Sequence, residues 1–164
     1  MPPPRDPVGP GQTSVWDHPR PPVAVPDARR VVVTFAGVTV VDTRRAVRLL
    51  ETSHPPTWYL PRADFAAGAL RDAPGSSFCE WKGRAVYLDV VVGGRVAPRV
   101  AWTYPDPSPP FAILRDCVAL YAAPMDGCFV DGERVTPQPG GFYGGWITRD
   151  VAGPFKGVPG STGW

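Results

Sequence analysis

The sequence predicts a mainly β domain of short antiparallel hairpins, with about one short helix and extended ends. Several short runs are rich in β-branched and aromatic residues, which are typical of strands. Glycine-containing pairs separate neighbouring runs, as expected for hairpin turns. Proline and glycine supply 23 and 18 of the 164 residues and gather towards the two ends, where irregular structure is therefore expected.

Composition divides the chain into an arm, a body and a tail. Residues 1–26 hold nine of the 23 prolines and show no periodicity, so we expect an extended arm. Residues 27–136 carry the β-like runs and form the predicted domain. Residues 137–164 are rich in glycine and aromatic residues. Such a tail is too aromatic for a free linker, so we expect it to pack on the body or on a partner subunit, with a homodimer through the ends as one outcome.

The first half of the body predicts three kinds of element. Residues 31–42 read as a hairpin of β-branched strands around an Ala-Gly turn. Residues 44–53 are compatible with a third strand or a short helix, which Pro55 ends in either case. Residues 57–60, TWYL, predict a short strand. Residues 61–73 begin with proline and contain small helix formers, so they are the best candidate for the helix.

The second half of the body contains two hairpin signals. Residues 78–92 and 95–104 flank Gly93-Gly94, and together they predict two long paired strands. Residues 111–123 are expected to open with a helical turn and close as a strand. Asp131-Gly132 lies between two β-like runs, which is typical of a two-residue hairpin turn.

Charge and motifs exclude several classes of protein. The net charge of +2, with mixed signs, gives no basis for binding nucleic acid or an anionic membrane. No run approaches the ~18 apolar residues of a membrane span, and no secretory signal is visible. The three cysteines are widely spaced, which favours a cytoplasmic protein with reduced thiols. No phosphate-binding glycine loop, dinucleotide fingerprint or metal-ligand cluster is present, so no cofactor and no metal site are expected.

The only two lysines of the chain lie in similar surroundings, Lys82 in CEWKG and Lys156 in GPFKG. If residues 78–92 form one strand, Trp81 and Lys82 point to opposite faces, and Lys82 faces either a pocket or solvent. The other interpretation is a surface lysine beside a core tryptophan. Lys156 belongs to the tail, and we interpret its setting as a local imitation of the first motif.

Four segments, LETSHPPTWYLPRADF, FCEWKGRAVYLDV, AWTYPDPSPPF and VALY, together resemble the DUF427 family over residues 31–123. The tail resembles the extension of longer actinobacterial members, which implies a bacterial source. The resemblance implies an Mss4-like or β-tent fold, in which two sheets meet at an angle over a pocket, but it implies no reaction. Other β-tent proteins bind zinc through paired Cys-x-x-Cys motifs; this chain has none, so no structural zinc is expected.

Basic and aromatic residues of these segments predict a pocket for a small anionic metabolite. Lys82 and Arg45 would hold the anionic group, with Glu51 orienting Arg45, and aromatic residues would form the walls. The alternative interpretations are purely structural: an ion pair of Arg45 and Glu51 at a sheet edge, and ordinary core tyrosines. The candidate ligand-binding residues are Lys82, Arg45, Tyr59, Trp81, Tyr87, Tyr104 and Glu51.

No catalytic motif is recognisable, so the sequence leaves open whether the protein is an enzyme. His54 follows Ser53, but neighbours in sequence rarely have the geometry of a catalytic pair. Cys79 is expected to be a small buried thiol, and His18 a solvated residue of the arm. Two other functions remain: a peptide- or protein-binding module with an open aromatic groove, and a homo-oligomeric assembly protein.

Overall fold

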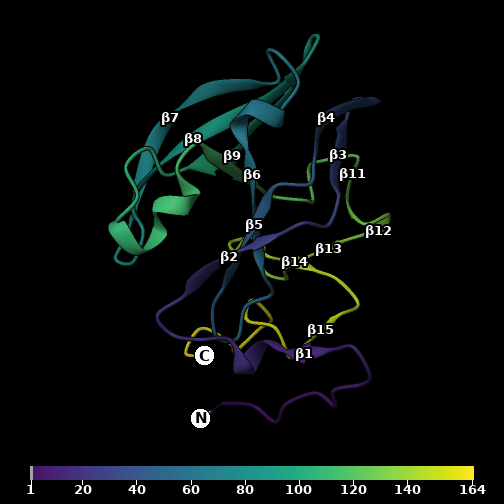
Figure 1. Cartoon of the computed structure of the whole chain (residues 1–164), viewed down its shortest axis with the longest axis vertical. Coiled ribbons are helices and arrows are strands. Elements are labelled where there is room, and N and C mark those ends of the chain that lie inside the picture. Colours follow the sequence, from purple (N-terminus) through teal and green to yellow (C-terminus); the bar gives the residue numbers. More distant parts are fainter. Residues whose placement is uncertain (1) are drawn as a thin grey trace.

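A computed structural model describes residues 2–164, and two antiparallel sheets dominate it (Figure 1). The prediction of a mainly β fold is confirmed. The seven-stranded sheet contains, in spatial order, β2 (Val23–Asp27), β5 (Ala46–Leu50), β6 (Thr57–Pro61), β10 (Cys117–Leu120), β9 (Arg95–Thr103), β8 (Gly83–Val92) and β7 (Leu70–Cys79). The four-stranded sheet contains β12 (Glu133–Arg134), β11 (Gly127–Val130), β3 (Val31–Phe35) and β4 (Val38–Thr43).

The remaining elements are short. Two small sheets pair β1 (Thr13–Ser14) with β15 (Val151–Ala152), and β13 (Thr136–Pro137) with β14 (Trp146–Ile147). The helical segments are short 3₁₀ helices: η1 (Val15–Asp17), η2 (Arg62–Asp64) and η3 (Pro109–Leu114). No helix within residues 2–164 is long and apolar enough to cross a membrane.

Apolar clusters cover both faces of the seven-stranded sheet. Alternate residues of a strand point to opposite faces, so Trp58 and Leu60 of β6 join the main core, together with residues of the four-stranded sheet. Tyr59, between them, joins a second cluster on the other face. All four residues of β10 are buried for the same reason. The second cluster lies where the candidate site is found.

Turn chemistry predicted the hairpins correctly. The β3–β4, β8–β9 and β11–β12 hairpins all form around the expected glycine-containing pairs. In the β11–β12 turn, Asp131 and Gly132 have φ of 46° and 80°, the left-handed conformation that this turn type requires. Residues 46–50 form a strand instead of a helix, residues 57–61 form the expected strand, and residues 111–123 give the expected helical turn followed by a strand.

The helix predicted over residues 61–73 is wrong. Only the single turn η2 forms, and Gly68 then takes a φ of 76°, which a helix cannot accommodate. From Leu70 the chain is the edge strand β7, in which Leu70 pairs with Val90. Small helix formers carry a preference of only a few tenths of a kcal/mol per residue, which pairing along a neighbouring strand overrides.

Residues 78–92 do not form one strand, which corrects the expected placement of Lys82. Phe78 and Cys79 end β7, and residues 80–82 turn the chain into β8. Gly83 has a φ of 106°, and a Cβ atom there would lie 3.3 Å from the main-chain oxygen of Asp106. Trp81 and Lys82 therefore sit in a tight turn and not on alternating faces of a strand.

The arm and the tail lie together at the end of the molecule opposite the long β7–β9 strands (Figure 1). Trp16 Nε1 donates a hydrogen bond to the main-chain oxygen of Pro154 (2.9 Å), and its ring meets that of Trp164 edge-on. His18, expected to be solvated, is instead buried, with Nδ1 3.2 Å from the main-chain oxygen of His54. The ends are thus held by contacts within one chain.

Candidate functional site

A cavity of about 510 Å³ lies on the face of the seven-stranded sheet that carries the second cluster. Side chains of β5, β6, β8 and β9 line it, among them Leu49, Tyr59, Ala85 and Trp102. The end of β7 and the turn after it form one side. The tail forms the opposite side. Residues between Leu49 and Tyr121 of the body and residues of the tail therefore meet at one site.

The walls of the cavity are largely aromatic. Trp102 Nε1 lies 3.4 Å from the hydroxyl of Tyr59, and the rings of Trp102 and Tyr121 have centroids 4.9 Å apart. The rings of Tyr59 and Tyr104 have centroids 6.3 Å apart. Burial raises the pKa of both Tyr59 and Tyr104 above the usual range, so both phenols stay neutral. They offer apolar faces and neutral hydroxyl groups to a ligand.

Lys82 lines the cavity from the β7–β8 turn, although only 7% of the residue is exposed. Its Nζ lies 5.4 Å from the centroid of the Tyr104 ring. Within residues 2–164 this ammonium has no hydrogen-bond acceptor and no carboxylate partner. Because the side chain lines the cavity, an anionic group bound there could reach this ammonium and form a charge-assisted hydrogen bond with it.

Lys156 lines the same cavity from the tail, which corrects its interpretation as a local imitation. Its main-chain N–H donates to the Ser53 oxygen (2.9 Å), and its Nζ donates to the main-chain oxygen of Trp164 (3.0 Å). The Nζ also lies 5.6 Å from the centroid of the Tyr143 ring. The ammonium of Lys156 is therefore already engaged within the chain, unlike that of Lys82.

Gln138 joins the tail to the body through a hydrogen-bond network that fixes the orientation of its amide. Gly145 N–H donates to Gln138 Oε1 (3.0 Å), and Gln138 Nε2 donates to the main-chain oxygen of Lys156 (2.8 Å). The second hydrogen of Nε2 points to His54 Nδ1, 3.0 Å away. Because the amide nitrogen only donates, Nδ1 must accept, and the proton of a neutral His54 is on Nε2.

His54 is suited to positioning and not to proton transfer. Burial, and then the nearby charges of Lys156 and Arg20, lower its pKa to about 4, so the ring is neutral near pH 7. Nδ1 is occupied by Gln138, and Nε2–H points towards Glu51, with Oε2 3.9 Å away. No free lone pair is left to act as a general base. Ser53 is fully buried, and its hydroxyl does not bond to the ring.

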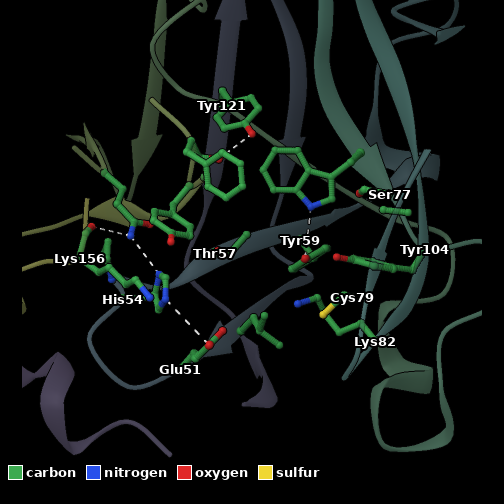
Figure 2. Close-up of a pocket in the computed structure, with 18 of the residues that line it drawn as sticks. Glu51, His54, Thr57, Tyr59, Ser77, Cys79, Lys82, Tyr104, Tyr121 and Lys156 are labelled. Atoms are coloured by element: carbon green, nitrogen blue, oxygen red, sulfur yellow. Dashed lines mark hydrogen bonds and ion pairs between the residues drawn. The ribbon is translucent and has the colours of Figure 1, made fainter. Parts of the chain in front are cut away.

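Five of the seven residues proposed from the sequence line this cavity, as Figure 2 shows for those that it labels. Trp81 is an exception, since it packs against the second cluster without lining the cavity. Arg45 is the other. Its side chain is 67% exposed and its Nη2 lies 2.7 Å from a carboxylate oxygen of Asp64, so the structure does not bring it together with Lys82 or Glu51. The five residues that line the cavity are Lys82, Glu51, Tyr59, Tyr87 and Tyr104.

Sequence reasoning missed most of the tail side of the cavity. Cys79, expected to be a small buried thiol, is half-buried and lines the cavity from the end of β7. The two matched aromatic-Lys-Gly motifs were the only local signal that tail and body share a site. The missed lining residues include Trp102, Tyr121, Gln138, Phe142, Tyr143 and Lys156.

Residues 2–164 contain no group of three or more His, Cys, Asp or Glu side chains placed to hold an ion. The three cysteines are free thiols and are not paired with one another.

Comparison with known proteins identifies the body of the chain. No curated protein matches the sequence. The family model described as the domain of unknown function DUF427 matches residues 23–131. This stretch contains the strands that form the floor of the cavity, together with Lys82 and Glu51, whereas Gln138 and Lys156 lie beyond it. Since the match covers well over half of the sequence, the chain belongs to the DUF427 family.

Proposed function

We propose that the cavity binds a small molecule whose anionic group meets Lys82 and whose apolar or aromatic body lies against the ring walls. One observation carries the proposal: Lys82 is buried, reaches the cavity and has no acceptor or counter-charge within residues 2–164. A carboxylate or phosphate on a ligand would supply both.

The size and walls of the cavity favour a compact ligand. A volume of about 510 Å³ lies within the ordinary range of small-molecule sites. Body and tail supply walls on two sides of this space, which suits a compact molecule better than an extended peptide. Trp16 packs against Trp164 and β1 pairs with β15 within one chain, so these contacts of the ends need no second subunit. The small-molecule function is therefore preferred to a peptide-binding or assembly role.

We also propose a cytoplasmic location, as expected for a chain whose three cysteines remain free thiols. The bacterial source and the β-tent relationship remain predictions from the resemblance.

Calorimetry with an aromatic acid and its neutral amide tests the role of Lys82. Hydrocinnamate and hydrocinnamamide have the same ring and chain and differ in the charged group. We expect the acid to bind about tenfold more tightly or better, since a charge-assisted hydrogen bond contributes about 1.5–3 kcal/mol. Lys82→Met should remove this preference for the acid.

Arg84→Met is the matched control for that experiment. Arg84 is exposed, precedes the lining residue Ala85 on β8 and so points to the other face, and its removal changes the net charge equally. It should leave the preference unchanged. Equal binding of acid and amide by the native chain, or loss of the preference in both variants, would overturn the proposal.

A further inference from the structure

We infer that the ligand is a zwitterion, with its anionic group at Lys82 and a cationic group at Glu51. The inference rests on the proposed function, since it concerns the same cavity. It concerns Glu51, the one carboxylate among the residues that line the site.

Glu51 follows the last residue of β5 and directs a carboxylate into the cavity. Its side chain is 26% exposed, and within residues 2–164 no group donates a hydrogen bond to its carboxylate, although its main-chain oxygen accepts from His54 N–H (3.1 Å). His54 Nε2 lies 3.9 Å from its Oε2, which is longer than a hydrogen bond.

No residue of the cavity neutralises Glu51. His54 is uncharged, because its Nδ1 accepts from Gln138 and burial disfavours the protonated ring. Neither Lys82 nor Lys156 forms an ion pair with Glu51. The carboxylate of Glu51 and the ammonium of Lys82 therefore face one cavity, and neither has a partner.

The fold keeps these two opposite charges apart. Lys82 is held in the tight turn between β7 and β8, and Glu51 follows β5, on the other side of β6, β10 and β9 in the sheet order. Figure 2 shows Lys82 beside Cys79 and Tyr104, and Glu51 beside His54. Each charge is thus presented separately to whatever occupies the space between them.

A ligand with both charges satisfies both groups at once. A simple anion would pair with Lys82 but would leave the carboxylate of Glu51 without a partner. Like charges at short range in a low-dielectric site also repel each other. A simple cation would gain Glu51 but would leave Lys82 without a partner.

The test compares zwitterions with matched anions by calorimetry on the whole chain. L-phenylalanine is paired with hydrocinnamate, and para-(aminomethyl)benzoate with para-toluate, so that two different separations of charge are sampled. We expect at least one zwitterion to bind about tenfold more tightly than its matched anion. Glu51→Gln should bring the two to equal affinity while leaving the affinity for the anion unchanged or higher.

Lys82→Met provides the complementary variant, and Arg84→Met the control for net charge. Lys82→Met should weaken zwitterion and anion alike, whereas Arg84→Met should change neither. If hydrocinnamate binds through Lys82 but neither zwitterion exceeds its anion, the zwitterion inference is overturned and the proposed function stands. The inference is also overturned if the preference for a zwitterion survives Glu51→Gln. If acid and amide bind equally to the native chain, the proposed function itself fails.

Discussion

At the scale of single residues, His54 decides how the tail is held against the body. Its Nδ1 accepts from Gln138 (3.0 Å), which fixes that edge of the ring, whereas its Nε2 lies 3.9 Å from Glu51 Oε2, too far for a hydrogen bond. The neutral form is required, because a protonated ring has no lone pair for the Gln138 amide. His54 follows Ser53 and could suggest a catalytic pair in the sequence. In the structure it instead links the tail to the body, and this link requires its neutral form.

The lowered pKa of His54 predicts an acid-sensitive stability. In the folded chain His54 has a pKa of about 4, whereas in the unfolded chain a histidine takes up its proton near pH 6.5. The contribution of this residue to the free energy of unfolding is therefore complete above pH 6.5 and is lost as the pH falls towards 4. Between about pH 7.5 and about pH 5 the free energy of unfolding should fall by about 2 kcal/mol from this residue. Burial also lowers the pKa of His18, which adds a loss in the same direction.

Urea unfolding of native and His54→Gln protein at these two pH values measures the effect. Between the two pH values, the free energy of unfolding of the variant should fall by less than that of the native chain. His18 accounts for part of the fall that remains. The four carboxyl groups whose pKa is lowered by arginine partners or main-chain N–H groups, Asp27, Asp42, Asp64 and Asp89, contribute mainly below this window. An unchanged difference between the two pH values in the variant would contradict the prediction.

At the scale of elements, two loops of the tail fit together so closely that only glycine is tolerated between them. Gly157 has a φ of 118°, and a Cβ atom there would lie 1.9 Å from the main-chain oxygen of Pro139. The neighbouring Lys156 reaches the cavity, and so do Phe142 and Tyr143 just after the facing loop. Backbone packing between these loops thus sets the tail side of the site.

Gly157→Ala should lower the free energy of unfolding by about 1–3 kcal/mol, because the clash involves backbone atoms and the conformation is strained for any other residue. Chemical denaturation measures the change. Gly163→Ala is the control, since Gly163 has open space around it and no positive φ. Equal stabilities of the two variants would show that the loops can separate without cost.

At the scale of the whole molecule, the tail completes the main core. Trp146 of β14 is 1% exposed, packs parallel to Trp58 and donates from Nε1 to the main-chain oxygen of Leu120 (3.2 Å). The arm in turn pairs with the tail through β1 and β15. The family domain at residues 23–131 is therefore covered by segments from both sides of it in the sequence.

Trp146→Ala should destabilise the protein by about 3–5 kcal/mol, the usual cost of removing a buried large aromatic side chain. Phe142→Ala is the matched control, because this tail aromatic is 74% exposed and its loss should change stability by only about 0.5 kcal/mol. Thermal and urea unfolding of both variants provide the measurement. If the two changes cost the same, the tail does not contribute to the core as described.

Local chemistry made much of this molecule predictable. Glycine pairs such as Gly93-Gly94 set hairpin turns through their own φ preferences, and continuous runs of apolar residues such as Cys117–Leu120 suit strands buried on both faces. The family motifs also pointed to Lys82 and to the tyrosines that line the cavity. The helix expected over residues 61–73 failed because weak propensity, without helical periodicity, competes poorly with strand pairing.

The candidate site itself depends on contacts between residues far apart in sequence. Family membership, the β-rich fold and the positions of the hairpins could be inferred from the amino-acid order alone, since each depends on short segments. The meeting of Lys82, Glu51 and Lys156 around one cavity, and the exclusion of Arg45 from it, follow from how the turn after β7 and the tail pack on the sheet. Such packing sums many long-range contacts, none of which a short segment specifies.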